Sequence, residues 1–402
     1  MANFSYKAID HNGEAENGYL FAETFDEASM ELKNRKLIPL KLKKINRRFN
    51  LNPFTSIGFS KLSLISRQLS TLVNSGIPVD QALDSVAEQI EPSRVRNKLK
   101  QVSLKVKSGF KFSESLEEHP ESFDKLYCSL VKAGESSGEL GIILEKTSDF
   151  LEKRANMTQE ITGALVYPII LFSVAIGIIS LLLAYVVPDV VSQFNSLDRE
   201  LPFLTKSLIF LSEIISSPFF LISLVTIPLV TFFLVRRIGI KKVRTIFDKF
   251  LLKVPVIKNF LLDADLSRFS SSLSLLRTGN VSIINALEIS ADTITNSFLK
   301  SEIKKSTIGV REGETLASSL QKVSVIPPLA VQMIQNGENS GKLEEMLFKL
   351  SEYLETRFKN SVKIAMNLLE PLVIIILGIF VALIVLAILL PLIQLNTFTT
   401  MI

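Results

Sequence analysis

The stretch Gly134-Glu135-Ser136-Ser137-Gly138-Glu139-Leu140 occurs twice in this chain, the second time as Gly337-Glu338-Asn339-Ser340-Gly341-Lys342-Leu343. Further upstream, residues 69–83 match residues 273–287 in the same order, so that each position of the first copy returns about 204 positions later. A repeat of this length indicates one helical module that is present in two copies. A duplicated module tied to apolar segments suggests a protein that holds other molecules rather than one that turns over a substrate.

Apolar segments follow the two copies and predict membrane spans. Hydrophobic residues make up 47% of the chain, more than a pair of soluble domains needs. Residues 164–187 form 24 uncharged positions, about 36 Å of helix, which is enough to cross a hydrocarbon core of roughly 30 Å. The segment 368–393 is uncharged from residue 371 onward, and the shorter segment 218–235 contains Pro228, which membrane helices tolerate. We therefore predict three transmembrane helices.

Prolines stand at matching places of the first and last spans: Pro168, Pro188, Pro371 and Pro391. We expect Pro168 and Pro371 to mark where each cytoplasmic helix passes into its span.

Charge on either side of the spans predicts the topology. Residues 236–258 carry eight basic residues against one acid, whereas the loop 188–217 carries four acids and two bases. By the positive-inside rule, the amino terminus, the basic juxtamembrane segment 236–263 and the second module are cytoplasmic, and the loop is periplasmic together with the tail 394–402. Anionic lipid attracts each basic residue near the surface by about 1 kcal/mol, so we attribute the net charge of +5 to membrane lipid and not to nucleic acid.

Residue patterns set the remaining boundaries. Residues 1–46 alternate apolar and polar positions around a helical stretch, which is typical of a small α+β head, and residues 47–60 read as a linker. Residues 61–163 and 264–367 repeat apolar positions at helical spacing. The predicted fold class is a mostly α polytopic membrane protein with two homologous cytoplasmic helical bundles. No apolar segment occurs in the first 45 residues, so no cleavable signal is expected.

Glycines and glutamates in the repeats predict turns. We expect turns at these glycines: Gly76, Gly134, Gly138, Gly337 and Gly341. At the four glycines of the repeated motif we expect left-handed backbone. Glu135 and Glu338 are each expected to cap the helix that follows, at its positive end.

Two short motifs suggest chemistry that their context excludes. Residues 134–138 fit the Gly-x-Ser-x-Gly pattern of serine hydrolases, but that motif needs a preceding strand and a histidine base, and the second copy has Asn339 at the nucleophile position. Residues 337–343 resemble a phosphate loop, but one intervening residue and the metal-binding hydroxyl are missing, so no nucleotide is expected. The single cysteine, Cys128, excludes disulfides within the chain and is predicted to be an inert core residue.

Acidic residues of the first module admit two interpretations. Glu145 and Asp149 lie one helical turn apart and Glu91 could approach them, which would suit calcium. A solvated acidic face explains the same residues, and from the residues alone it is the favoured reading. A solute channel or transporter is disfavoured, because the spans offer almost no ionisable side chain and Glu370 at the last entry suits a boundary or interhelical contact.

Several further stretches carry a family resemblance. They are the head from Phe4 to Gly13, the turn Ser75-Gly76-Ile77-Pro78, the pairs Tyr167-Pro168 and Val187-Pro188, and the final stretch from Glu370-Pro371 to Leu390-Pro391. Together with the repeated motif they resemble protein F, the inner-membrane platform of type II secretion systems. Platform proteins of type IV pilus assembly share most of these features, but the ending Ile388-Leu389-Leu390-Pro391 is closer to the secretion branch.

The resemblance implies a non-catalytic scaffold in a bacterial inner membrane that couples a cytoplasmic secretion ATPase to assembly of a periplasmic pseudopilus. The implied partners are that ATPase, the inner-membrane proteins L and M, the pseudopilins and further copies of the chain. The resemblance also implies a calcium site on the first bundle, where Glu91, Glu145 and Asp149 fall.

The charge asymmetry generates a testable topology. Reporter fusions after residues 60 and 300 should be active in the cytoplasm, and a fusion after residue 200 in the periplasm, because eight basic residues follow the middle span. A periplasmic residue 300 would eliminate the middle span. Paired enzymatic reporters that are active on only one side of the membrane make this measurement.

Overall fold

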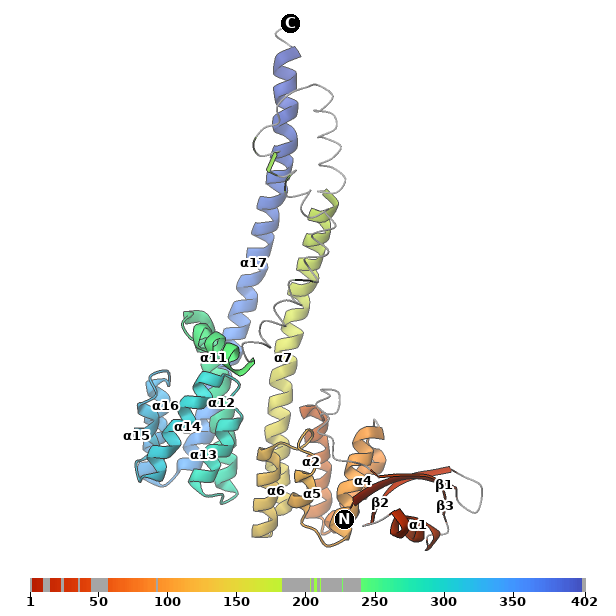
Figure 1. The fold of residues 1–402 in the computed structure, drawn as a ribbon. Coiled ribbons are helices and arrows are strands. Elements are labelled where there is room, and N and C mark those ends of the chain that lie inside the picture. Colours follow the sequence, from red (N-terminus) through yellow and green to blue (C-terminus); the bar gives the residue numbers. More distant parts are fainter. Residues whose placement is uncertain are drawn as a thin grey trace. The chain divides into compact units, whose positions relative to one another are not determined.

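The computed structural model in Figure 1 describes residues 2–9, 15–22, 25–34, 37–44, 57–91, 93–182 and 240–399, with a few single positions between 203 and 226. The described chain forms two compact units, residues 1–148 and 149–402. The predicted loop 188–217 with Pro188, the predicted span 218–235 and the chain end after residue 399 lie outside these residues, isolated positions apart.

The amino-terminal segment contains strands β1 (Ala2–Ile9), β2 (Ala15–Ala22) and β3 (Ile38–Lys44) and helix α1 (Phe25–Asn34). The antiparallel sheet has the order β2-β1-β3. Ala8 of β1, Ala28 and Leu32 of α1 and Leu37 form the buried core between sheet and helix. Because Asp26 and Glu27 lie in the first turn of α1, their charges favour the positive end of that helix.

Each repeat forms the same six helices within the described residues. The first copy consists of α2 (Phe59–Asn74), α3 (Val79–Gln89), α4 (Ser93–Lys107), α5 (Phe112–Glu117), α6 (Lys125–Ser137) and α7 (Leu140–Leu181). The second copy consists of α12 (Pro255–Thr278), α13 (Ile283–Asp292), α14 (Ser297–Arg311), α15 (Leu316–Gln321), α16 (Pro328–Ser340) and α17 (Leu343–Thr399), preceded by α11 (Ile240–Leu251). The matching order explains the repeat in the sequence as one bundle that is built twice.

Buried serines join the first and last helices of each bundle at equivalent places. In the first copy the Ser63 hydroxyl donates to the carbonyl of Ser148 at 3.2 Å, and the Ser70 hydroxyl to that of Gly141 at 2.9 Å. In the second copy the Ser267 hydroxyl donates to the carbonyl of Ser351 at 3.0 Å, and the Ser274 hydroxyl donates to the carbonyl of Glu344 at 2.8 Å. Each hydroxyl satisfies its own buried polar group and fastens the closing helix, α7 or α17, to the bundle.

The last helix of each bundle continues into the apolar segment without a break. Helix α7 has 42 residues and α17 has 57, which correspond to about 63 Å and about 86 Å of helix. Both are long and apolar enough to cross a membrane, as predicted for the first and last spans. Pro168 and Pro371 were expected to mark the passage from bundle to span. Both lie inside continuous helix, so neither helix breaks at its proline, and Pro391 also lies inside α17.

Two glycines end the helices that precede these long ones. Gly138 has φ +74° and Gly341 has φ +66°, both left-handed, so the expectation for these positions is confirmed. Gly76, in the predicted turn 75–78, also has left-handed backbone, at φ +83°, and its counterpart in the second copy is Asn280 at φ 57°. Asparagine tolerates this backbone better than other residues with a side chain.

Replacing Gly138 by Val should destabilise the first bundle by roughly 1–2 kcal/mol or more, because left-handed backbone strains a β-branched residue. Gly138→Asn is the matched control and should lose much less, as the second copy already uses Asn280 at such a position. The midpoint of thermal unfolding of the full chain in detergent measures both. Equal midpoints for the two variants would contradict the argument from the backbone.

Candidate functional site

The repeated motif places one carboxylate at the start of a short helix in each bundle. Glu135 of α6 accepts hydrogen bonds from the backbone N–H groups of Phe112 at 2.6 Å and Ser113 at 3.0 Å, at the start of α5. Glu338 of α16 accepts from Leu316 at 2.7 Å and Ala317 at 2.9 Å, at the start of α15. The prediction that these glutamates cap the helix that follows is therefore wrong. They cap the preceding short helix, whose free N–H groups attract an anion.

The first glycine of each motif serves close packing. Gly134 and Gly337 lie inside α6 and α16, so the left-handed backbone predicted for them is wrong. A Cβ on Gly134 would lie 2.9 Å from the Cα of Leu140, and a Cβ on Gly337 would lie 2.9 Å from the Cβ of Met346. These distances are too short for real side chains, so glycine is needed where α6 meets α7 and α16 meets α17.

The motif as a whole connects three helices. Its first glycine leaves room for the long helix to pack closely, and its glutamate caps the short helix. Its second glycine makes the turn that leads from α6 or α16 into the long helix. The result is a rigid corner at the base of α7 and of α17. Each corner holds the first turns of its long helix against its bundle.

Ser136 has no catalytic surroundings in this corner. It lies inside α6, exposed, and its hydroxyl donates to the carbonyl of Lys132 at 2.8 Å, so no strand precedes it as a nucleophile elbow requires. Burial lowers the pKa of His119, the one histidine of the described bundles, although Glu121 opposes the shift. Cys128 is buried, and burial raises the pKa of its thiol to about 12. The prediction of an inert core cysteine is confirmed, because the thiolate is the reactive form.

The described residues give the calcium prediction no support. Glu145 and Asp149 are exposed on neighbouring turns of α7, and the backbone carbonyl of Glu91 accepts a hydrogen bond from Lys61 at 2.9 Å. No three Asp, Glu, His or Cys side chains come close enough to hold a metal ion in the parts of the chain that the structure describes. A calcium site at these three residues stays a prediction.

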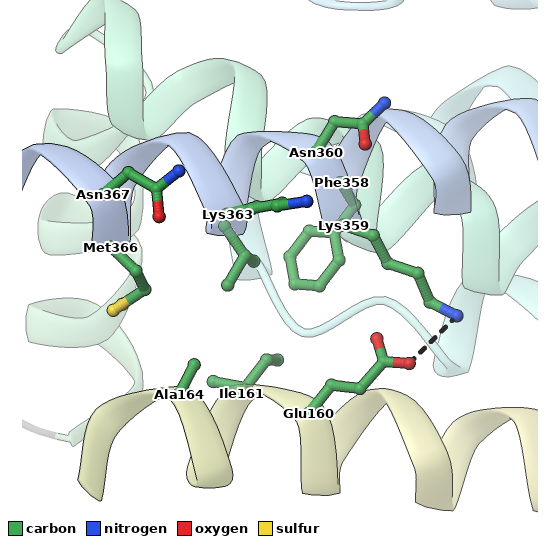
Figure 2. Close-up of a pocket in the computed structure, with 10 residues that line it drawn as sticks. Glu160, Ile161, Ala164, Phe358, Lys359, Asn360, Lys363, Met366 and Asn367 are labelled. Carbon is green, nitrogen blue, oxygen red and sulfur yellow. Dashed lines mark ion pairs between the residues drawn. The ribbon is translucent and has the colours of Figure 1, made fainter. Parts of the chain in front are cut away.

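In the second unit, α7 faces α17 along the approach to the apolar segments. Figure 2 shows this region, where Glu160, Ile161 and Ala164 of α7 lie opposite Phe358, Lys359 and Met366 of α17. They line a cleft of about 350 Å³. Beside the cleft, Met157 of α7 packs with Ala264 of α12 and Phe358 of α17. The ring centres of Phe260 and Phe358 lie 4.5 Å apart.

Polar contacts tie the same two helices together. Glu160 pairs with Lys359 at 3.3 Å, and Lys153 pairs with Glu352 at 3.3 Å. Nearer the apolar segments, the Tyr167 hydroxyl donates to Glu370 at 3.0 Å. Glu370 thus makes the interhelical contact expected of it, but its partner Tyr167 was not predicted. The matching place of Tyr167 and Glu370, each directly before a repeated proline, is the signal that could have found the pair.

A buried acid, Asp263, was also not predicted from the sequence. Asp263 of α12 is 1% exposed, and neither of its carboxylate oxygens has a hydrogen-bond partner among the described residues. Its ion-pair partner is Arg357 of α17, 3.3 Å away. Burial raises the pKa of Asp263 and the Arg357 charge opposes the rise. The pair connects α12 to α17 where α17 leaves the bundle.

The fold and these contacts define a scaffold of two homologous helical bundles that ends in helices suited to a membrane. Residues 65–188 and 269–391 match the family described as type II secretion system (T2SS), protein F, and residues 1–43 match the N-terminal domain of protein F. The chain belongs to the type II secretion system protein F family, which confirms the resemblance seen in its residues.

Named relatives extend over the whole chain. Type II secretion system protein F of Vibrio cholerae is 34% identical over 98% of this chain and 99% of that protein. Its counterpart of Pseudomonas aeruginosa is 36% identical over the same shares. Type IV pilus assembly protein PilC of Thermus thermophilus is 33% identical over 98% of both chains. None of these three is named as an enzyme, in agreement with the prediction of a non-catalytic protein.

The glutamate caps can be tested by charge removal. Glu135→Gln should lower the stability of the first bundle by about 1–2 kcal/mol, because the amide replaces one of two anionic acceptors at the start of α5 with a donor. Glu338→Gln should have a similar effect on the second bundle. The midpoint of thermal unfolding and the rate of proteolysis near residues 108–112 measure the loss.

Glu88→Gln is the matched control for Glu135→Gln. It removes the same charge from an exposed position inside α3, away from the start of that helix. A loss of stability in Glu88→Gln equal to that in Glu135→Gln would show that net charge, and not the cap, decides the outcome.

Proposed function

We propose that this protein is the inner-membrane platform of a type II secretion system. In this proposal a cytoplasmic secretion ATPase acts on the bundles, and the long helices carry the resulting displacement into the membrane, where pseudopilins are added to the pseudopilus. The observation that carries the proposal is the unbroken course of α7 and α17 from bundle to apolar segment. Membership of the protein F family supports the same assignment.

Stiffness is the physical reason why this course matters. A continuous helix transmits rotation or translation because each turn is hydrogen-bonded to the next, whereas a loop between bundle and span would absorb the motion. The base of each long helix is fastened by two serine hydrogen bonds and by the packing of a glycine against it. A force on the bundle therefore reaches the helix without slippage at its base.

The motor must be a separate chain in this proposal. The sequence contains no phosphate loop, and the serine of the repeated motif lies inside a helix with its hydroxyl bound to backbone. The proposed partners are the secretion ATPase on the cytoplasmic side, proteins L and M and the pseudopilins in the membrane, and further copies of this chain. Proteins of this kind work by contact, so we expect Ser136→Ala to leave export nearly unchanged.

A platform of type IV pilus assembly is the second candidate. The relative of Thermus thermophilus with that name is 33% identical over 98% of this chain, almost as similar as the secretion proteins. A strain that lacks its secretion platform and a strain that lacks its pilus platform separate the two, because only the cognate system should be restored by this chain. A solute transporter has less support, since residues 164–181 of α7 and 371–399 of α17 contain no Asp, Glu, Lys or Arg.

The transmission of force can be tested at residues 162–164 of α7, between the Glu160 contact and Pro168. Substituting Thr162→Gly and Ala164→Gly creates three consecutive glycines, each of which lowers helix stability by about 1 kcal/mol relative to Ala. Export of a reporter enzyme should fall several-fold, because the helix can then bend between bundle and span. Export is measured in a strain that lacks its own platform, at equal amounts of membrane-inserted protein.

Thr162→Ala combined with Gly163→Ala is the matched control, with three consecutive alanines at the same place. A Cβ on Gly163 meets nothing within 4 Å, so the added methyl group has room. This variant should export at least as well as the unchanged chain. Equal export by the glycine and alanine variants would overturn force transmission through α7.

A further inference from the structure

Helix α11 is held against the second bundle by one of its faces. The Asp248 carboxylate accepts hydrogen bonds from the backbone N–H of Ser297 at 2.7 Å and from the Ser297 hydroxyl at 2.6 Å, at the start of α14. Arg244, one turn earlier, donates to the carbonyl of Thr295 at 3.0 Å. Leu252, directly after the helix, is buried. This face of α11 is therefore occupied by the bundle.

The opposite face of α11 presents large apolar side chains to the surroundings. Ile246 is 64% exposed, Phe247 59% and Phe250 61%. At about 100° per residue, Ile246 and Phe250 lie within roughly 40° of each other and about 160° from Asp248. These three side chains, which we call the α11 apolar face, cannot reach the bundle without breaking the Asp248 cap.

Basic residues flank the α11 apolar face. Lys249 and Lys253 are exposed in and just after the helix, and Asp248 is the one acid of residues 240–253. The Lys249 ammonium lies 5.4 Å from the centre of the Phe298 ring, at the border between the bundle and the apolar face. Asp248 is turned toward the bundle, so the exposed side is apolar with a basic rim. An amphipathic helix of this composition suits the boundary between headgroups and acyl chains of an anionic bilayer.

The place of α11 in the second unit favours lipid over a protein partner. Figure 1 shows α11 at the end of the bundle from which α17 continues toward its apolar segment. Helix α12, which starts four residues after α11, packs its Phe260 against Phe358 of α17. Phe358 precedes Pro371 by 13 residues, about 20 Å of helix. Helix α12 runs antiparallel to α17, since Phe260, Ser267 and Ser274 contact Phe358, Ser351 and Glu344 in turn, so α11 lies on the side of Phe358 that is nearer Pro371.

We propose that α11 lies in the cytoplasmic interface of the inner membrane, with the α11 apolar face in the acyl boundary and its lysines among anionic headgroups. This inference rests on the membrane placement in the proposed function but not on secretion. Because Asp248 ties α11 to the start of α14, the interfacial helix sets the height of the second bundle above the bilayer. It gives that bundle a lipid contact in addition to α17.

A depth measurement on the full chain in lipid nanodiscs tests the proposal. A nitroxide is attached at Phe247→Cys in a Cys128→Ala background, and its collisions with oxygen, which concentrates in the bilayer, are compared with those of a water-soluble nickel complex. The oxygen-to-nickel ratio should be several-fold higher at Phe247 than at Ser301→Cys, an exposed position of α14. Ile379→Cys in α17 gives the value for the bilayer.

The lipid composition provides a second readout. Discs with 30% phosphatidylglycerol should place the Phe247 label deeper than discs of phosphatidylcholine alone, because the basic rim attracts anionic headgroups. A Phe247 label as accessible to nickel as the Ser301 label in both discs would overturn the proposal. Shielding from oxygen and nickel alike would also overturn it, since a second copy or another protein would then cover the face. Both results leave export, and thus the proposed function, unaffected.

Discussion

A single helix in each repeat both closes the helical bundle and continues into the apolar segment, and most other features of the structure secure that helix. The glycine at its base lets it approach its neighbour closely, and the left-handed glycine turns the chain into it. Two buried serines fasten it to the first helix of the bundle. The glutamate of the same motif holds the adjacent short helix in place. These contacts hold the base of each long helix against its own bundle.

The fold class could be predicted from the sequence because its signals are local and repeated. Uncharged stretches longer than the hydrocarbon core predict spans, and helical spacing of apolar residues predicts bundles. The repeat predicts that equivalent residues of the two copies are buried alike, and Leu69 and Leu273, like Leu83 and Leu287, are indeed buried in both copies. The left-handed glycines at 138 and 341 followed from the same patterns. Cys128 followed as well, because a lone cysteine in an apolar helical pattern has no other role.

The details of the site could not be predicted, because they depend on which helices come together. Glu135 lies five residues before the start of α7, so the next helix start along the sequence belongs to that helix, yet the tertiary fold brings the backbone N–H of Phe112 at the start of α5 within 2.6 Å. Glu370 and Tyr167, like Asp263 and Arg357, pair across long stretches of chain. Side-chain exposure is likewise a tertiary property. Ile246, Phe247 and Phe250 have the spacing of a core face, and the Asp248 cap turns them outward.

The two repeats share their internal bonding. Equivalent caps, serine bonds and close-packed glycines in both copies show that the corner was duplicated together with its bundle. Among the described residues, α11 precedes the first helix of the second copy and presents an apolar face that the bundle leaves uncovered. A bundle attached by one helix can tilt about it, whereas a second contact away from the helix axis resists tilt. With α11 in the membrane interface, as proposed above, the second bundle gains such a contact and is held at a fixed position.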